Sequence, residues 1–476
     1  MTAAPGTRFR DALDSLAGCL ACGDLADSVE LAEEPPLLAT RFAAGPGAAA
    51  ALGAGAAVAG RIGAARGLAS AGPGAVSLSS RHVEASLLSF AHLEFEDPDL
   101  APAARLEPEA RTAAAGFLQA ADGRWVYLHP GFPHNTRGLL KLLGVPDDSD
   151  RVRAAVAARP ARALEDAIAG AGLCGAMVRT AEEWDASPAG ALLASRPVVE
   201  VIQLGDSAPE PLPEGADRPL DGVRVLDLTR VLAGPACART LASYGARALR
   251  VGAEHVPTIP LFVADTGFGK RFTHLDLTRP DATQTLRRLV RQADVFSQGY
   301  RTGVMDRLGF GVSEAVQLRP GLVYVSINCY GHEGDWRGRP GWEQLAQTVT
   351  GIAHAHGAHT GAEAPVLLPA AVTDYTTGYL AALGVLVALE RRARVGGSYW
   401  VRVSLARTGM WLRGLGLRDG LEAMPMTENE RHRWRDRMDS DWGPVRYLRP
   451  AVRLAGTEVG WSLPPPRPGA HTPEFL

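Results

Sequence analysis

The chain has 476 residues, a length that predicts two or three domains. Its 49 basic and 52 acidic residues give a formal net charge of −3, so there is no electrostatic reason to expect nucleic acid or an anionic membrane as a partner. Hydrophobic residues make up 46% and charged residues 21%, which is a globular composition and excludes disorder over most of the chain.

Cysteine usage and hydropathy indicate a cytoplasmic protein. Five scattered cysteines are too few for a disulfide scaffold. The opening residues MTAAPGTRFRDALD carry charges and have no apolar core, so we expect no secretory signal. The uncharged stretch 43–60 has about the length of a bilayer span, but it is nearly all Ala and Gly and contains Pro46. We therefore expect no membrane span and no membrane partner.

The N-terminal half mixes helices with a few strands. Residues 1–75 predict a helical region with an Ala/Gly-rich tract, and 75–95 predict a short strand followed by an amphipathic helix. A D-G turn followed by WVYL predicts a strand in 122–131, and RPVVEVIQLG predicts another at 196–205. We assign 76–206 to a small α+β domain. The acidic, proline-rich segment 207–218 is then a linker.

After the linker, apolar strands alternate with helices of about ten residues. The strand VRVLDLT is followed by the turn AGPA (233–236) and then a helix. Further strands are predicted at ARALRV, HLDLT, DVFSQG and LVYVSIN. This alternation is typical of a parallel sheet with helices on both faces. We therefore predict an α/β fold with a doubly wound (Rossmann-like) sheet in 219–415, with 416–476 as a C-terminal segment that returns to the fold.

A weak internal repeat singles out one acid. Residues 371–405 resemble residues 42–78, and alignment of their Leu-Gly pairs places Ala43 opposite Asp374. Residues 1–75 are therefore interpreted as a degenerate partial repeat that kept its pattern and lost the acid. By itself, an Asp at a helix start is most often only a helix cap.

Five segments in order resemble the family III CoA-transferases, the CaiB/BaiF group that includes formyl-CoA and carnitine CoA-transferases. They are PLDGVRVLDLTRVLAGPACARTLASYG, GKRFTHLDLTRPDA, QADVFSQGYRTGVMDRLGFG, RPGLVYVSINCYGHEGDWRGRPGWEQLAQTVTG and AVTDYTTGYLAALGVLVALE. The end, PGAHTPEFL, is similar to the closing signature of the family. Segments of 76–206 resemble the small domain that normally follows the α/β domain. The order here is close to a circular permutation, and the resemblance implies a homodimer.

The resemblance implies that Asp374 is the nucleophile. A carboxylate can attack an acyl-CoA to give a mixed anhydride, which the CoA thiolate reopens as an enzyme thioester before a carboxylic acid accepts the CoA. Asp374 opens a helix, with Thr373 as its expected cap. We expect the helix N-terminus to keep the carboxylate ionised and to stabilise oxyanions.

The resemblance also assigns neighbours to that residue. Glu343 takes the place of an acid close to the nucleophile. The positions that match CoA-binding ones are Leu232, Ala233, Lys270, Arg271, Leu275, Tyr300, Arg307 and Trp342. The expected ligand is coenzyme A as a substrate, with a carboxylic acid as the second substrate.

Two departures leave alternatives open. Trp342 stands where racemases of this fold have a catalytic His, so a racemase is disfavoured. The segment 252–266 is shorter than the corresponding segment of the family. Contacts to the CoA phosphates that the longer segment makes would be absent from this chain. An acyl-CoA lyase, dehydratase or isomerase and a non-catalytic binding protein remain as alternatives. We expect no metal, because no carboxylate or cysteine lies near His354, His356 and His359 in the sequence.

Overall fold

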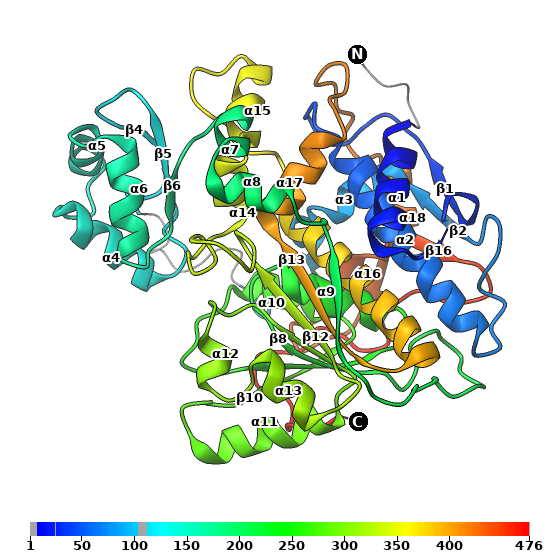
Figure 1. The fold of residues 1–476 in the computed structure, drawn as a ribbon. Helices are drawn as coiled ribbons and strands as arrows, with labels where there is room; N and C mark the ends of the chain where they lie inside the picture. The colour runs from blue at the N-terminus through cyan, green and yellow to red at the C-terminus, as the bar shows by residue number, and fades with distance from the viewer. Residues whose placement is uncertain (1–6, 24, 103–111, 476) are drawn as a thin grey trace.

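A large sheet organises the structure, a computed structural model that describes residues 7–23, 25–102 and 112–475 (Figure 1). Its seven strands lie in the order β10 (Lys270–His274), β9 (Arg247–Gly252), β8 (Arg224–Leu228), β11 (Val295–Gln298), β12 (Val323–Asn328), β13 (Ser398–Ser404) and β7 (Glu200–Gly205). The first six are parallel, and β7 is antiparallel to β13. The predicted α/β class with a parallel-rich sheet is confirmed.

The chain reverses direction at β8. It runs outward from β8 to β10, then returns to the other side of β8 with β11 and continues to β13. Neighbouring residues of the strands are buried on opposite faces: Val225 belongs to one apolar core and Leu226 to another. Because both faces are covered, the strands consist of continuous apolar runs. The reversal between β8 and β11 is where doubly wound sheets bind ligands.

Helices cover both faces of the sheet. One core contains α9 (Ala233–Ser243) and α16 (Val372–Val395), and the other contains α11 (Pro280–Gln292) and α13 (Val312–Leu318). The remaining helices of this part are α10 (Pro260–Gly267), α12 (Val304–Arg307), α14 (Glu343–Val349), α15 (Ile352–Thr360) and α17 (Leu405–Gly414).

The N-terminal region packs against α16. It contains α1 (Thr7–Leu20), the Ala/Gly-rich α2 (Ala44–Ala64) and α3 (Ser80–Ser86). Helices α2 and α16 are in direct contact, and an ion pair of 2.7 Å joins Arg61 to Glu390. Both helices are long and apolar enough to cross a membrane, but 89% and 100% of their most apolar stretches are buried in the protein. In this fold they are core helices.

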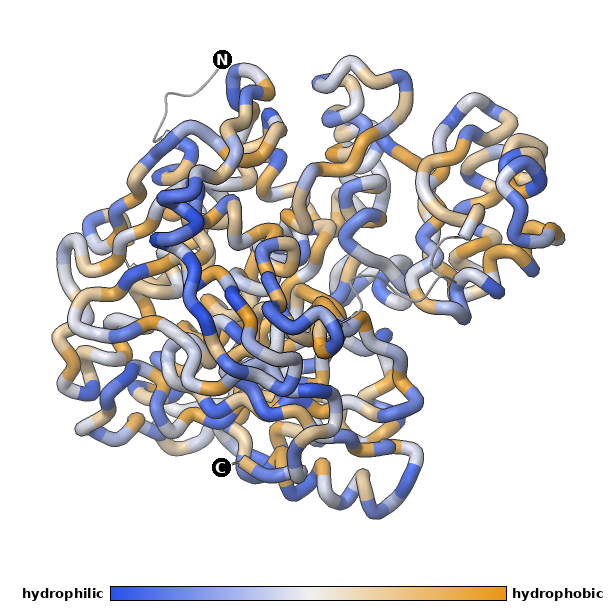
Figure 2. Tube along the Cα trace, turned by 180° about the vertical axis from the view of Figure 1, so that it is seen from behind, coloured by the Kyte–Doolittle hydropathy of each residue, from blue (hydrophilic) through white to orange (hydrophobic). Residues whose placement is uncertain are grey.

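Residues 112–178 form a small lobe. Its sheet has the order β4 (Gly116–Gln119), β5 (Trp125–Leu128) and β6 (Gly175–Met177), and it packs on α4 (Pro133–Leu143), α5 (Ser149–Ala157) and α6 (Ala161–Gly170). The lobe protrudes from the rest of the molecule in Figure 1, where it is cyan to green, and in Figure 2, which shows the opposite side.

The range predicted for the small domain, 76–206, is therefore too wide. Strand β2 (Val76–Ser79) pairs with β1 (Val29–Ala32), and β7 is the edge strand of the large sheet. An antiparallel strand covers the edge that β13 would otherwise expose. Helices α7 (Ala181–Asp185) and α8 (Pro188–Ala194) also leave the lobe, because the fully buried Trp184 donates a hydrogen bond to Met410 of α17.

The C-terminal segment returns to the N-terminal half. It contains α18 (Glu428–Trp434), β14 (Arg435–Met438), β15 (Val445–Leu448) and β16 (Val452–Leu454). Strand β15 pairs with β3 (Glu94–Phe95), and β16 pairs with β2. Two small sheets are thus built from strands of both ends of the chain.

Two local predictions are wrong. The segment AGPA is the first turn of α9 and not a separate turn, because proline is tolerated where the N–H has no helical partner. The strand expected at HLDLT lies earlier, at Lys270–His274, and pairs with β9.

Candidate functional site

A cavity of about 450 Å³ lies at the carboxyl ends of β8, β11 and β12, where the chain reverses direction. Residues that follow these strands line it: Thr229, Gly299, Asn328 and Cys329. The small lobe supplies Phe132, His134, Asn135 and Cys174 from the other side. The cavity is therefore enclosed by two parts of one chain that are far apart in the sequence.

Asp374 lines this cavity from the first turn of α16. Asp374 is 7% exposed to solvent. The backbone N-cap is Ala371, which makes no side-chain cap hydrogen bond, so the expected cap by Thr373 is wrong. Instead, the first turn of α16 is capped by Glu343, which lies at the start of a different helix, α14. The Glu343 carboxylate accepts hydrogen bonds from the N–H groups of Thr373 at 3.1 Å and Asp374 at 2.5 Å.

Glu343 is held by further donors. The Thr373 hydroxyl donates to Oε2, and the Gln347 amide donates to Oε1 at 2.5 Å. Glu343 is 6% exposed and does not line the cavity. Four hydrogen bonds to a buried carboxylate favour its charged form. Glu343 therefore acts on Asp374 through the backbone and through its charge.

The electrostatics of Asp374 differ from the sequence-based expectation. Burial raises the pKa of Asp374 well above its usual range, and the charge of Glu343 raises it further. Burial likewise raises the pKa of Glu343. The helix N-terminus was expected to keep Asp374 ionised, but Glu343 occupies two of its N–H donors. Of the two carboxyl groups, Asp374 is therefore the one that takes up a proton first.

The loop between β8 and α9 forms another wall of the cavity. Leu232 and Ala233 line it, as predicted from the sequence. Val231 has a φ of 69°, a left-handed conformation that is rare for a β-branched residue. Such strain persists only where surrounding contacts impose it, and it is concentrated at functional sites.

A buried ion pair below this loop holds it in place. The Lys270 ammonium lies 2.8 Å from Asp227 and donates to the carbonyl of Pro235 at 2.7 Å. The same Asp227 carboxylate accepts a hydrogen bond from the N–H of Thr229 at 3.0 Å. Burial outweighs this pairing and lowers the pKa of Lys270 to about 8. Lys270 thus connects the end of β8 to the first turn of α9.

The cavity is strongly basic. In the described part of the chain, Asp374 is its only acidic lining residue. Four arginines line it: Arg230, Arg301, Arg337 and Arg339. The Arg230 guanidinium lies 4.6 Å from the centroid of the Phe132 ring. The sequence analysis missed these arginines, although three of them stand in the quoted segments GYRTGVMDR and DWRGRPGW. A cavity with this charge suits an anionic ligand.

Trp342 connects the lobe to the α/β part. Its ring stacks on His129 with centroids 5.1 Å apart, and its Nε1–H donates to the Cys174 sulfur at 3.2 Å. Both contacts run from the residue that precedes α14 to the lobe. Trp342 and Tyr300 line the cavity together with Asp374, so these predicted residues do come together.

Four predicted CoA-binding residues lie outside the cavity. Lys270 is 1% exposed and is committed to Asp227, which leaves no free ammonium for a phosphate. Arg271 lies near Thr472, at 3.4 Å, in a separate hollow. Leu275 packs against the core on one side of the sheet. Arg307 is exposed on α12. No group of three His, Cys, Asp or Glu in the described residues is arranged to hold a metal ion.

Comparisons with known proteins agree with this geometry. Residues 220–435 match the model of CoA-transferase family III. This part of the chain is similar to that family. The matched part contains β8, the strained loop, Glu343 and Asp374, and it ends at the start of β14.

Curated proteins that the chain resembles include several transferases. An acyl-CoA transferase of Gibberella moniliformis is 34% identical over 328 residues, which cover 64% of this chain and 57% of the relative. The beta subunit of a succinyl-CoA–L-malate CoA-transferase of Chloroflexus aurantiacus is 32% identical, covering 39% of this chain and 49% of the relative. A CaiB/BaiF family protein of Brucella suis is 26% identical with a TM-score of 0.38, covering 41% and 55% of the two chains. The chain thus spans about half the length of the curated relatives it matches.

Proposed function

We propose that this protein is an acyl-CoA:carboxylate CoA-transferase and that Asp374 is its nucleophile. The observation that carries the proposal is the position of the Asp374 carboxyl. It faces a basic cavity at the carboxyl edge of the parallel sheet, while Glu343 fixes the turn on which it stands. The match of residues 220–435 to the CoA-transferase family III model supports the same chemistry.

The proposed reaction keeps charge and atoms in balance. The Asp374 carboxylate attacks the thioester carbonyl carbon, the C–S bond breaks, and CoA leaves as a thiolate. The thiolate then attacks the Asp374 carbonyl of the mixed anhydride, which releases the donor acid and leaves an enzyme thioester. The acceptor carboxylate reverses both steps. Thiolate and carboxylate exchange places, so no net proton is consumed.

The residues of the cavity suit this sequence. The arginines at the cavity wall attract the CoA phosphates and the acceptor carboxylate. Ala233 and Gly234 line the cavity in the first turn of α9, where backbone N–H groups lack helical partners. In this proposal these two N–H groups stabilise the oxyanion, because Glu343 occupies those of Thr373 and Asp374.

The test is a search for the covalent intermediate. Incubation with an acyl-CoA is expected to give a hydroxylamine-sensitive adduct on the peptide that contains Asp374, detected by mass spectrometry. Asp374→Asn keeps the size of the side chain and is expected to lose the adduct and roughly a thousandfold or more in rate. The control is Asp276→Asn, at a site outside the cavity.

Two results would contradict the proposal. Full activity of Asp374→Asn without an adduct would exclude Asp374 as the nucleophile. Turnover of a single acyl-CoA without any acceptor acid would instead indicate a lyase, dehydratase or isomerase.

A further inference from the structure

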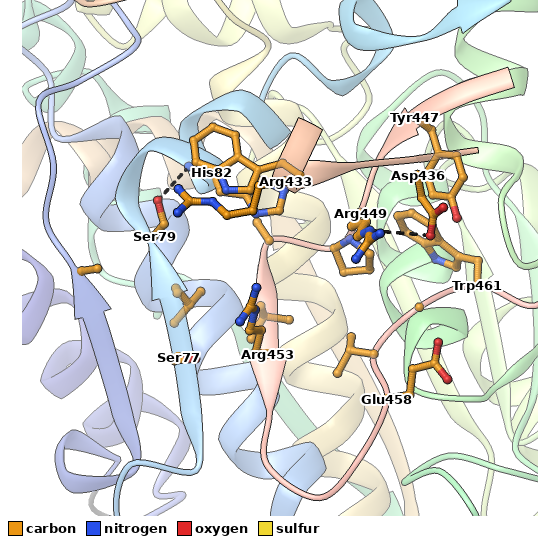
Figure 3. A pocket seen from close by; sticks show the side chains of 18 of the residues that line it. Ser77, Ser79, His82, Arg433, Asp436, Tyr447, Arg449, Arg453, Glu458 and Trp461 are labelled. Carbon is orange, nitrogen blue, oxygen red and sulfur yellow. Dashed lines mark hydrogen bonds and ion pairs between the residues drawn. The ribbon is translucent and has the colours of Figure 1, made fainter. Parts of the chain in front are cut away.

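A second cavity, of about 660 Å³, lies on a different part of the molecule (Figure 3). It is bounded by β2, by α18 with β14, and by β15 and β16. Within the described residues, the two cavities share no lining residue. The family III chemistry proposed for Asp374 makes no use of it.

One end of this cavity is basic. Arg433 and Arg453 line it, and neither has an ion-pair partner in the part of the chain that the structure describes. Arg449 lies between the two ends and has a loose contact of 3.5 Å with Asp436. Of these exposed guanidinium groups, Arg433 belongs to α18 and Arg453 to β16, whereas Arg449 directly follows β15. Glu34 also lines the cavity, and its carboxylate accepts a hydrogen bond from the Ser79 hydroxyl. Arginines without an ion-pair partner in a concave site favour a bound anion.

His82 adds a buried polar group at the same end. It is 8% exposed, its ring stacks on Trp434 with centroids 4.8 Å apart, and its Nε2 has no hydrogen-bond partner. Burial lowers the pKa of His82 to about 3, so the ring is neutral at pH 7. An unpartnered buried nitrogen is costly unless a ligand or water satisfies it. His82 lines the cavity beside Arg433, as Figure 3 shows.

The other end is aromatic and carries acids. Figure 3 shows Tyr447 and Trp461 there, together with Asp436 and Glu458. The aromatic side chains offer a surface to a flat ring, and the carboxylates accept hydrogen bonds from hydroxyl or amino groups. The cavity thus combines an anion-binding end with an end suited to a ring and its polar substituents.

We propose that this cavity is a second binding site, distinct from the Asp374 site, and that its ligand is a phosphorylated nucleoside. The phosphate binds to Arg433, Arg453 and the Nε2 of His82. The base lies against Tyr447 and Trp461, and the ribose hydroxyls donate to Asp436 or Glu458. A volume of 660 Å³ is within the range of small-molecule sites.

Calorimetric titration of the full chain with AMP tests the proposal. We expect AMP to bind, adenosine to bind much more weakly, and inorganic phosphate to compete with AMP. Arg433→Ala/Arg453→Ala is expected to weaken AMP binding roughly tenfold or more, because charge-assisted hydrogen bonds to the phosphate are lost. His82→Phe keeps a ring against Trp434 and removes Nε2, so it is expected to weaken AMP binding as well.

The controls separate this site from the Asp374 cavity. Arg288→Ala/Arg291→Ala removes the same charge from exposed positions on α11 and is expected to leave AMP binding unchanged. Arg230→Ala alters the Asp374 cavity and is also expected to leave it unchanged. Arg433→Ala/Arg453→Ala is expected to keep its rate of CoA transfer. Absence of AMP binding, equal binding of adenosine, or loss of AMP binding only in Arg230→Ala would overturn the proposal.

Discussion

Asp374 and Glu343 are two buried carboxyl groups with opposite surroundings. Glu343 accepts four hydrogen bonds, whereas the Asp374 carboxylate has no hydrogen-bond donor among the described residues. Burial therefore costs Asp374 more in its ionised form, and the Glu343 charge adds to that cost. The pair titrates together, with Asp374 keeping its proton to the higher pH.

This pairing predicts the pH dependence of the reaction. In the proposed reaction only ionised Asp374 attacks the thioester, so kcat/KM is expected to be lost as the pH falls through the raised pKa of Asp374. Glu343→Gln removes the neighbouring charge, and the acid limb of the kcat/KM profile should move to lower pH. The side-chain amide introduced by this substitution also points an N–H group at the N–H donors of α16, which disturbs the turn that carries Asp374. We therefore expect kcat to fall roughly tenfold to a hundredfold.

A profile of kcat/KM against pH for both proteins checks this prediction. Glu363→Gln, at an exposed position, is the matched control and should leave the profile where it is. An acid limb that stays in place in Glu343→Gln would show that Glu343 does not influence the charge of Asp374.

At the scale of elements, the buried pair Lys270–Asp227 ties β10 to β8 and to the first turn of α9. Lys270→Met leaves Asp227 with an uncompensated charge, and we expect a loss of about 3–5 kcal/mol in the free energy of unfolding. Lys270→Met/Asp227→Asn should recover much of that loss. Chemical denaturation measures both, with Lys141→Met at an exposed position of α4 as the control. Equal stability of Lys270→Met and the unmodified protein would contradict the structural role.

The contact between α16 and α9 depends on Gly378. A Cβ at this position would lie 2.5 Å from the carbonyl oxygen of Ala233 and 2.8 Å from the Cβ of Ala236. We expect Gly378→Ala to cost about 1–3 kcal/mol of stability and to raise KM, because the displaced turn lines the cavity. The control is Gly55→Ala, because a Cβ at Gly55 would lie 3.7 Å from its nearest neighbouring atom. This substitution should leave the temperature of thermal unfolding unchanged or raise it. Equal effects of the two substitutions would argue against tight packing at Gly378.

Local patterns explain which elements were predictable. Strands β8, β9, β11 and β12 were found because apolar runs of their length are buried on both faces, whereas β10 was placed too late in the sequence. Helix α16 was found by its continuous apolar sequence. The cap of α16 was missed because Glu343 lies on a different helix, and no local pattern indicates a partner 30 residues away. Lys270 was misplaced because a lysine bound to phosphate and one paired with a buried Asp look alike in sequence.

At the scale of the molecule, the lobe and the α/β part of the chain face each other across the Asp374 cavity. Asp374→Ala and Phe132→Glu each alter one side of it, the second by placing a carboxylate among the arginines. If each chain completes its own cavity, a mixture of the two inactive variants should stay inactive after co-refolding. Recovered activity would show that the lobe of one copy serves the α/β part of another. The homodimer implied by the family resemblance stays a prediction, which light scattering measures separately.

The pairing of β2 with β16 has a consequence for biosynthesis. Leu78 lies opposite Val452, so the sheet of the N-terminal region lacks a strand until residues 452–454 have been synthesised. Strand β3 waits in the same way for β15. During synthesis the apolar α2 has neither α16 nor this sheet to cover it, and incomplete domains of this kind are prone to aggregate. The N-terminal region is thus expected to depend on chaperones early in translation and to become protease-resistant only after β16 has emerged from the ribosome.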